Sequence, residues 1–480
     1  MYLCRKRNKM RRKEPLPFFE KIEISDAGAE GKAVARVGNK VIFVPFVVPG
    51  DVVDIQVNRK KKSYYEGRAV KVHRYSDERV EPECSHFGLC GGCRWQNMKY
   101  ERQLHYKQKQ VADNLQRIGK LDTPPIMPII PCEQPYYYRN KMEFTFSSRR
   151  WFTEKPDPDR QKLHNSNGLG FHLPGIFDRI LDIDHCYLQA DPSNAIRLEA
   201  RRFALEHSYD FYDARNWDGY LRNLIIRNTT GSDLMVIVVF RYVDHIKGPA
   251  LLDHLAATFP AITSLMYVIN GKRNDDISDL EVVPYKGNSY ISEEMDGLSF
   301  RIGPKSFFQT NTRQALKLYR TVKDFAALSG NEIVYDLYTG TGTIACYIAG
   351  AALKVVGIEY NEQAIVDAGK NASLNAIGNV SFYAGDMLKV FNSSFVNGHG
   401  HPDVIITDPP RAGMHEKVIG QILACRPGRI VYVSCNPATQ ARDLAILAGE
   451  YIISAVQPVD MFPQTHHVEN IVLLERPQAK

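Results

Sequence analysis

The stretch Arg429-Ile-Val-Tyr-Val-Ser-Cys435-Asn-Pro437 decides how this chain is expected to fold. An apolar run of β-branched and aromatic residues ends in a small polar turn, which carries Cys435 and closes at an Asn-Pro pair. Such a run predicts a buried strand that leads into a loop. Because ligands of an open α/β sheet bind at the carboxyl ends of its strands, Cys435 is expected at the edge of a binding crevice. A free thiol with a pKa of about 8.5 is only about 3% thiolate at pH 7, so a reactive cysteine needs help from its surroundings. The alternative is an inert structural cysteine.

Strand and helix patterns alternate on both sides of this stretch. Residues Asn311–Leu328 show the apolar spacing of an amphipathic helix. Further strands are expected at Ile333–Leu337, Lys354–Glu359, Val380–Asp386, Asp403–Asp408, Tyr451–Val459 and Val468–Glu475. This alternation predicts a doubly wound, mainly parallel sheet.

The length of 480 residues predicts about three domains. We expect a basic flexible arm at 1–16, a small β-barrel at 17–76, a central α+β domain at 77–310 and the doubly wound domain at 311–480. No apolar run approaches the ~18 residues of a membrane span, and no apolar segment follows the basic N-terminus as it would in a signal peptide. We therefore expect a cytoplasmic protein, whose nine cysteines are ligands, catalysts or core residues rather than disulfides.

Positive charge is concentrated near the N-terminus. Residues 1–75 contain 18 Lys and Arg against 8 Asp and Glu, whereas the rest of the chain contains 43 against 46. Short β-type runs between turn glycines and prolines in residues 21–74 predict a small barrel, and barrels of this kind often bind RNA on one face. The run Arg59–Lys62 beside Tyr64 and Tyr65 puts phosphate-binding charge next to stackable rings. RNA is therefore the expected partner; the alternative is a solvated tail that aids solubility.

Three thiols fall within ten residues, in the pattern Cys84-x5-Cys90-x2-Cys93. In a cytoplasmic protein this density indicates a metal. A zinc site normally shows two paired Cys-x2-Cys units, and only one is present. An iron–sulfur cluster needs a fourth thiolate, for which Cys186 is the best candidate, so spacing alone leaves both metals open. The cysteines without ligand-type neighbours are expected to be inert: Cys4, Cys132, Cys346 and Cys425.

The middle region combines expected strands with irregular segments. After a helix at Tyr100–Ile118, strands are expected at Lys141–Ser147, Gly168–His172, Leu221–Asn228, Leu234–Phe240 and Ser264–Ile269. Residues 122–135 are rich in proline and predict a linker, and residues 153–167 predict a loop insertion. The run Tyr136–Lys141 mixes aromatics with cations, which suits either an RNA-contact surface or half-buried tyrosines at a strand edge.

A glycine turn, Asp336-x3-Gly340-x-Gly342, follows the first strand of the C-terminal region. It lacks the third glycine of the dinucleotide fingerprint and is a weak signal by itself. Glu359 ends the next strand, where a carboxylate can accept both ribose hydroxyls, and Asp386 ends the one after it, within reach of an adenine edge. This is the layout of class I S-adenosylmethionine methyltransferases; the alternative is a Rossmann-like sheet without a cofactor.

Another strand end carries Asp408-Pro-Pro-Arg411. Its two prolines remove backbone donors and stiffen the loop. The N6-adenine methyltransferases have an aromatic residue after Pro-Pro, where this chain has Arg411. That difference argues against methylation of an exocyclic amine.

Together, these motifs resemble the RNA uracil-5-methyltransferase family, and specifically its 23S ribosomal RNA members with a TRAM domain and an iron–sulfur cluster. The resemblance covers almost the whole chain. It rests on Gly31–Arg36, Val48–Asp51, Cys84-x5-Cys90-x2-Cys93, Tyr138–Lys141, Cys186, Phe307–Gln309, Asp336–Thr343, Asp408–Arg411, Ser434–Pro437 and His467–Glu469. The chain departs from the family at the 153–167 insertion, and at Tyr338-Thr-Gly-Thr, where many relatives have Phe-Cys-Gly.

The resemblance implies an α/β protein with an N-terminal OB-like TRAM barrel, a central α+β domain and a C-terminal class I methyltransferase domain. It implies that Cys435 is the nucleophile that adds to uracil C6, and that Glu469 is the base that removes the C5 proton. For Glu469 the alternative is a surface carboxylate near a sheet edge. The resemblance also implies a [4Fe-4S] cluster with these four ligands: Cys84, Cys90, Cys93 and Cys186.

By the same resemblance, Phe307 lies near the target base, and a core phenylalanine is the alternative. The S-adenosylmethionine site is expected to be lined by Gln309, Tyr338, Thr343, Glu359, Asp386 and Asp408.

Three other functions share part of this pattern. A tRNA uracil-5-methyltransferase is the nearest, and the TRAM-like barrel and the cysteine set favour the ribosomal branch over it. An RNA cytosine-5-methyltransferase also uses a cysteine, but Asp408–Arg411 and His467–Glu469 fit uracil better. A non-catalytic RNA-binding assembly factor is the third. Ribosomal RNA is the expected partner, with no membrane and no obligate protein partner.

Overall fold

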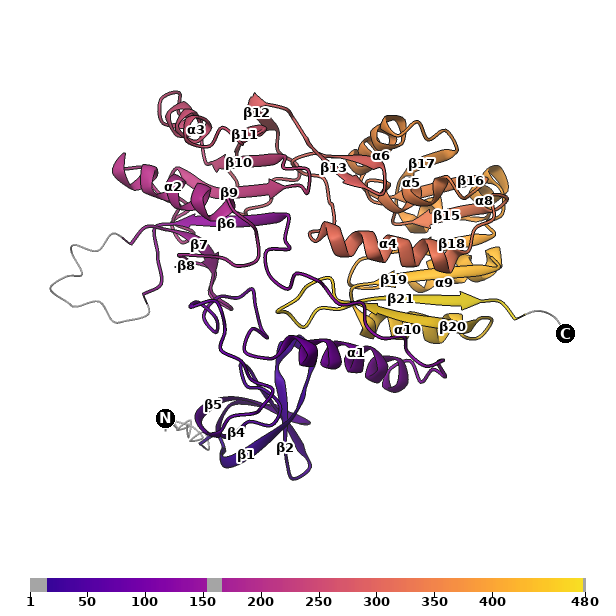
Figure 1. Cartoon of the computed structure of the whole chain (residues 1–480), viewed down its shortest axis with the longest axis horizontal. Coiled ribbons are helices and arrows are strands. Elements are labelled where there is room, and N and C mark those ends of the chain that lie inside the picture. Colours follow the sequence, from indigo (N-terminus) through magenta and orange to yellow (C-terminus); the bar gives the residue numbers. More distant parts are fainter. Residues whose placement is uncertain (1–14, 153–165, 478–480) are drawn as a thin grey trace, which may run out of the picture.

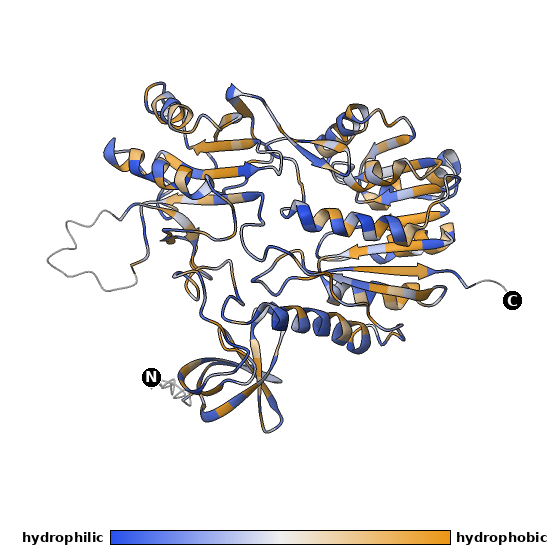
Figure 2. Cartoon of the chain, viewed as in Figure 1, coloured by the Kyte–Doolittle hydropathy of each residue, from blue (hydrophilic) through white to orange (hydrophobic). Residues whose placement is uncertain are grey.

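A computed structural model describes residues 15–152 and 166–477 of the chain (Figure 1). The predicted arm at 1–16 and the predicted insertion at 153–167 therefore lie almost entirely outside the described residues. The described chain forms a barrel, a central sheet and a C-terminal sheet. Figure 2 shows hydrophobic residues concentrated in the strands of the two large sheets. No described helix is long and apolar enough to cross a membrane.

The N-terminal unit is a closed five-stranded barrel, which confirms the prediction from its short strands and turn residues. Its strands are β1 (Phe18–Ala27), β2 (Ala33–Val37), β3 (Lys40–Val44), β4 (Val52–Lys60) and β5 (Tyr64–Arg74). Side chains alternate between the two faces of each strand, so a single face fills the interior. Its small core contains Ile24, Ala35, Ile42, Val53 and Ile55.

The central unit is a seven-stranded sheet in the order β12-β11-β10-β9-β6-β7-β8. Its strands are β6 (Lys141–Ser147), β7 (Gly168–His172), β8 (Ile180–Asp182), β9 (Leu221–Asn228), β10 (Leu234–Phe240), β11 (Ser264–Ile269) and β12 (Val282–Gly287). Helices α2 (Ser193–Glu206) and α3 (Lys247–Thr258) cover one face. The other face shares a core with the hairpin β13 (Ile291–Met295) and β14 (Leu298–Ile302), and with the C-terminal unit. That shared core fixes the two large sheets relative to each other.

The C-terminal unit is the predicted doubly wound sheet, in the order β17-β16-β15-β18-β19-β21-β20. Its strands are β15 (Ile333–Leu337), β16 (Lys354–Glu359), β17 (Val380–Ala384), β18 (Val404–Thr407), β19 (Arg429–Ser434), β20 (Ile452–Val459) and β21 (Glu469–Glu475). The first five are parallel, and β21 pairs antiparallel with both β19 and β20.

Helices cover both faces of this sheet, as a doubly wound fold requires. One face packs against α4 (Thr312–Ala326), α5 (Thr343–Ala349) and α6 (Glu362–Leu374). The other packs against α7 (Met387–Val390), α8 (Ser393–His399), α9 (Glu416–Cys425) and α10 (Pro437–Leu447). Asn361 caps α6 by accepting hydrogen bonds from two backbone N–H groups, as the sequence predicts.

Helix α1 (Tyr100–Arg117) packs on the C-terminal sheet, although it lies in the segment assigned to the central domain. Its residues Val111 and Leu115 join the core that contains α10. Lys107, also on α1, forms a fully buried ion pair with Asp460. The chain after α1 continues along the same sheet, where Ile130 bridges to Val459. The barrel and the C-terminal sheet are thus joined through α1.

Candidate active site

Cys435 lies in the tight turn between β19 and α10. The backbone N–H of Asn436 donates to Ser434 Oγ at 3.1 Å, and the Asn436 side chain caps α10 by accepting from the N–H of Ala438. Pro437 follows at the first position of the helix, where no N–H is needed. The turn therefore holds the Cys435 side chain, which is partly buried, at the carboxyl end of the central strands.

Glu469 begins β21, and strand pairing brings it across from Cys435. Ser434 pairs with Asn470 in the antiparallel ladder between β19 and β21, so Cys435 and Glu469 are the next residues beyond that pair. Glu469 is only 4% exposed. Its burial, together with repulsion from Asp408, raises the pKa of its carboxyl to about 8, and the Arg411 guanidinium opposes this rise.

The Cys435 thiol shares these electrostatic surroundings. Burial first, and then the carboxyls of Glu469 and Asp408, raise the pKa of Cys435 to about 11. Arg411 acts in the opposite direction and favours the thiolate. In the sequence, Arg411 belongs to the Asp408–Arg411 motif and argues against an N6-adenine enzyme, but nothing there predicts a contact with the thiol; its closeness to Cys435 is information that only the fold supplies.

A group of carboxyls with raised pKa values surrounds the ends of β15, β18 and β21. Burial raises the pKa of Asp336 to about 7, and burial with repulsion from Asp336 raises the pKa of Asp408 to about 7. Asp336 accepts a hydrogen bond from Thr339 Oγ1 at 2.5 Å through one oxygen, while its other oxygen has no protein partner. Asp408 thus repels both Asp336 and Glu469. A cation placed among them would stabilise their charged forms.

The glycine turn after β15 requires its glycines. Gly342 has a φ of +74°, and a Cβ atom on it would lie 2.8 Å from Phe382 and 2.9 Å from Ala368. The backbone N–H of Gly340 donates to Glu359 Oε2 at 3.2 Å, and the N–H of Asn361 donates to Glu359 Oε1 at 2.9 Å. These contacts place the Glu359 carboxylate at the mouth of the turn.

The remaining expected cofactor residues surround the same turn. Thr343 begins α5 and its hydroxyl accepts from Tyr319 Oη at 3.4 Å; Tyr338 lies at the start of the turn with a φ of +65°. Asp386 caps α7 by accepting from the N–H of Leu388, so one of its oxygens serves the fold. The Gln309 carbonyl accepts from Asn140 Nδ2 at 2.9 Å, which ties this residue to the central domain.

Phe307 projects from the segment that links the central sheet to α4. Its side chain is 69% exposed, which does not fit the alternative of a core phenylalanine. Its backbone carbonyl accepts from Thr341 Oγ1, in the glycine turn, at 3.4 Å. The segment that carries Phe307 and Gln309 is thus attached to the turn that carries Gly340 and Gly342.

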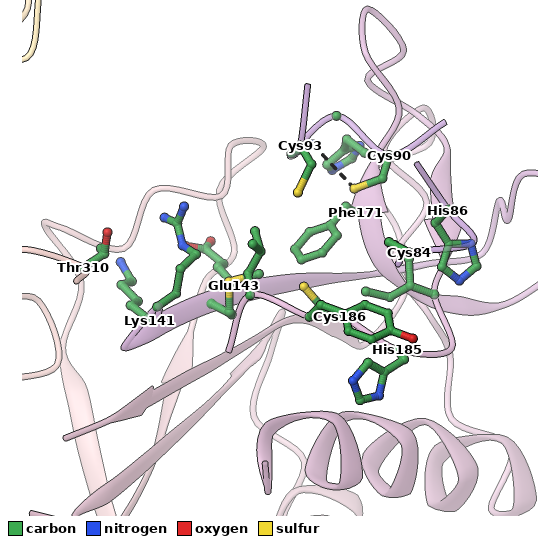
Figure 3. Close-up of a pocket in the computed structure, with 18 of the residues that line it drawn as sticks. Cys84, His86, Cys90, Cys93, Lys141, Glu143, Phe171, His185, Cys186 and Thr310 are labelled. Atoms are coloured by element: carbon green, nitrogen blue, oxygen red, sulfur yellow. Dashed lines mark hydrogen bonds between the residues drawn. The ribbon is translucent and has the colours of Figure 1, made fainter. Parts of the chain in front are cut away.

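The four cysteines proposed as ligands line one cavity of about 700 Å³. Figure 3 shows the sulfur atoms of Cys90, Cys93 and Cys186 turned toward the same space. Burial raises the pKa of Cys93 to about 12 and of Cys186 to about 11, and the neighbouring thiols add repulsion. Such thiols keep their protons unless a metal replaces them.

The thiols that line this cavity are not arranged as a metal site in this structure. Among the described residues, no three His, Cys, Asp or Glu side chains converge closely enough to hold a single metal ion. Cys132, Cys346 and Cys425 are buried away from this cavity, as expected for inert cysteines, and Cys4 lies outside the described residues.

Comparison with known proteins supports the resemblance to RNA uracil-5-methyltransferases with a TRAM domain. Residues 288–477 match the family described as tRNA (Uracil-5-)-methyltransferase, and residues 21–75 match the TRAM domain of tRNA (uracil(54)-C(5))-methyltransferase. A relative from Bacteroides thetaiotaomicron, named an uncharacterized RNA methyltransferase, is 56% identical over 93% of this chain and 99% of its own. One from Porphyromonas gingivalis with the same name is 53% identical over 95% and 99%.

A solved structure is similar over nearly the whole length. The Pyrococcus abyssi tRNA (uracil-54, C5)-methyltransferase, in complex with S-adenosyl-L-homocysteine, has a TM-score of 0.73 and 28% identity, and covers 94% of this chain and 100% of its own. A TRAM barrel joined to a methyltransferase sheet with a thiol at its edge defines an RNA methyltransferase. The chain belongs to the RNA uracil-5-methyltransferase family.

Proposed function

We propose that this enzyme transfers a methyl group from S-adenosylmethionine to C5 of a uridine in 23S ribosomal RNA, through a covalent adduct between Cys435 and uracil C6. The observation that carries the proposal is the placement of Cys435 opposite Glu469, at the end of β19 and β21. The reaction needs one nucleophile and one base on the same pyrimidine, and these two groups supply both.

The chemistry explains why both groups are needed. Uracil C5 is a poor nucleophile. Addition of the Cys435 thiolate to C6 forms an enolate in which C5 becomes the nucleophilic carbon. S-adenosylmethionine supplies the methyl group as an electrophile attached to a sulfonium. The C5 carbon then carries both a methyl group and its original hydrogen. Removal of that proton by Glu469 expels the thiolate, restores the double bond and leaves 5-methyluridine.

The protonation states of the free site fit this order of events. With a pKa of about 8, the Glu469 carboxyl is mainly protonated at pH 7, and the Cys435 thiol, with a pKa of about 11, is protonated as well. Binding of a sulfonium cation beside Asp408 would favour the carboxylate forms. Arg411 favours the thiolate once the base is in place. The sulfonium is therefore expected to help Glu469 lose its proton, and Arg411 to help Cys435 lose its proton.

The cofactor site is proposed at the mouth of the glycine turn. We assign Glu359, held by two backbone N–H groups, to the ribose hydroxyls, and Asp386 to the adenine edge. Gln309 and Asp408 are assigned to the methionine end, nearest Cys435. Tyr338 and Thr343 complete the set. Phe307, exposed beside this site, is assigned to the target base, which must leave its stack in folded RNA to reach Cys435.

The four thiols are proposed to hold a [4Fe-4S] cluster. All four line one cavity, and four thiolates are the number that such a cluster requires. Cys84, Cys90, Cys93 and Cys186 are its assigned ligands. The proposed transfer moves no net electrons between protein and RNA, so the role assigned to the cluster is to shape the RNA-contacting surface.

A tRNA substrate is the second candidate, and a specific observation favours it. The TRAM domain that matches residues 21–75 is that of a tRNA (uracil(54)-C(5))-methyltransferase, so a TRAM barrel does not separate ribosomal from transfer RNA enzymes. The cysteine set is the remaining argument for ribosomal RNA. The basic N-terminal unit suits either substrate, and a cytoplasmic location serves both.

Mapping 5-methyluridine in the RNA of cells with and without this protein tests the proposal. Loss of one or more 5-methyluridines from 23S RNA supports the ribosomal assignment, and loss from tRNA supports the second candidate. An increase of 5-methylcytidine on adding the protein back would identify a cytosine enzyme instead. Unchanged modification in both RNAs, together with no affinity for S-adenosylmethionine, would leave the RNA-binding assembly factor.

A further inference from the structure

The cavity that contains the four cysteines extends to Phe307, and this far end carries a group of cations. Arg139, Lys141, Arg227 and Lys305 line it, together with the single carboxyl of Glu143. Cys435 and Glu469 do not line it. Figure 3 shows Lys141 near Thr310, at the opposite end of the cavity from the cysteines. This part of the cavity is unexplained by the reaction at Cys435.

Strand pairing forces two of these cations together. Lys141 on β6 is directly opposite Arg227 on β9 in the antiparallel ladder. Like charges in this position repel each other and destabilise the sheet. Burial and the charges of Arg227 and Arg139 lower the pKa of Lys141, while Glu143, two residues along the same strand face, opposes that change. The pair is unfavourable without an anion.

The guanidinium of Arg227 is already committed to the fold. It is 3% exposed and donates to the carbonyls of Gly303 at 2.6 Å and Ser306 at 2.7 Å, directly before Phe307. Lys305 likewise donates to the carbonyls of Ser278 and Leu280. These two side chains support the Phe307 segment and contribute charge.

Arg139 and Lys141, in contrast, have no such partners. Within the described part of the chain, neither side chain forms an ion pair or a hydrogen bond, and Arg139 Nε is buried without an acceptor. The Arg139 guanidinium lies 6.0 Å from the ring centroid of Phe462, and both residues are half-buried, so the N–H groups of both can donate to phosphate oxygens. Both residues line the cavity, and the charge of Arg139 acts on Lys141.

We propose that Arg139 and Lys141 bind a backbone phosphate of the substrate RNA, in the end of this cavity that Phe307 borders. This inference rests on the RNA substrate of the proposed function and assigns a contact next to the target nucleotide. Holding the phosphate there would keep the flipped uridine beside Phe307 while its base reaches Cys435 on the other side.

Salt-dependent binding tests the contact directly. We measure how tightly Arg139→Ala and Lys141→Ala bind unmodified tRNA and 23S RNA transcripts between about 50 and 200 mM salt. Each lost phosphate contact lowers the slope of log K against log salt by about 0.7–0.9. We expect that loss of slope and a Kd for RNA raised about tenfold. Lys141→Arg keeps the charge and should keep the slope. Lys286→Ala, at an exposed lysine on β12 outside the cavity, is the matched control and should change neither.

Three outcomes would overturn the assignment. An unchanged slope and affinity in both alanine variants removes the phosphate contact. Loss of iron from both variants would mean that the cations serve the cysteine site instead. Stabilisation of the wild type by inorganic phosphate alone, with an unchanged RNA slope, would indicate a free-anion site. Binding is measured without methyl transfer, so the slope can be interpreted even if the proposed reaction is wrong. If only the phosphate contact is wrong, the enzyme still forms 5-methyluridine.

Discussion

Lys107 Nζ lies 2.5 Å from Asp460 Oδ1, and both side chains are completely buried. Lys107 also donates to the carbonyl of Phe462 at 2.9 Å, and Asp460 accepts from Tyr100 Oη at 2.7 Å. The pair therefore joins helix α1 to the connection between β20 and β21. That connection leads directly to Glu469, so its placement determines where the proposed base lies.

Breaking this pair on one side should unfold the protein at a lower temperature. Lys107→Met leaves the Asp460 carboxylate buried without its cation, and we expect a loss of about 3–5 kcal/mol in the free energy of unfolding. Chemical denaturation measures it. Lys107→Met combined with Asp460→Leu should recover most of the loss, because no unpaired charge remains. A double variant no more stable than the single one would contradict this account.

Cys435→Ala should abolish the covalent adduct with RNA that contains 5-fluorouridine. A fluorine at C5 cannot leave as a proton, so the adduct accumulates in the wild type and is visible as a shifted band on a denaturing gel. Turnover should fall by on the order of 10³-fold or more. Cys425→Ala, at a buried cysteine away from the site, is the control and should form the adduct normally. A full yield of adduct from Cys435→Ala would show that another residue is the nucleophile.

Glu469→Gln should separate adduct formation from turnover. The amide cannot take the C5 proton, so we expect the methylated adduct with ordinary uridine RNA to persist, with little free 5-methyluridine. In the wild type, kcat/KM should rise with pH through a value near 8, since the base must be deprotonated in the free enzyme. The part of the rise near pH 8 should be absent from the residual activity of Glu469→Gln, in which only the Cys435 thiol still titrates. Rapid turnover by the variant would assign the base elsewhere.

Affinity for S-adenosylmethionine should increase with pH. The folded protein raises the pKa of Asp336 and Asp408 to about 7 and of Glu469 to about 8, so these carboxyls are protonated at low pH and a sulfonium gains little from them. As pH rises through this range they become charged and attract the cation. S-adenosylhomocysteine lacks the sulfonium and should show a smaller gain. Calorimetry in buffers of different ionisation enthalpy measures how many protons are released when each ligand binds. If the affinities of both ligands depended equally on pH, the attraction between these carboxyls and the sulfonium would be refuted.

Cys186→Ala should remove the proposed cluster from the protein. We expect loss of the brown absorbance of anaerobically purified protein and of most of its iron, because one of four thiolates is gone. Cys346→Ala, at a buried cysteine in α5, should retain both. Stoichiometric zinc in the wild type, with no iron, would replace this assignment.

The sequence predicts those parts of the structure that depend on local patterns. The run before Cys435 forms β19, the short runs between turn residues close into a barrel, and Asn361 caps α6. Each depends on periodicity or on the chemistry of one turn, both visible in a few consecutive residues.

Features that join distant segments could not be predicted in this way. The docking of α1 on the C-terminal sheet pairs Lys107 with a residue 353 positions later, and no local pattern records that contact. The closeness of Arg411 to Cys435 and the repulsion between Asp336 and Asp408 likewise depend on how strands pair across the sheet. Only the fold shows them, and they set the protonation of the site.

The cysteine segment also touches the connection that leads to Glu469. The backbone N–H groups of Arg94 and Trp95, directly after Cys93, donate to the carbonyl of Gln464 at 2.8 and 3.1 Å. If the thiols hold the proposed cluster, its loss under oxygen or iron starvation would loosen this anchor and displace the base. Methylation would then decline in iron-limited cells before the protein disappears, so the 5-methyluridine content of the RNA would depend on the iron supply. Equal amounts of 5-methyluridine per enzyme molecule in iron-starved and iron-fed cultures would exclude such a link.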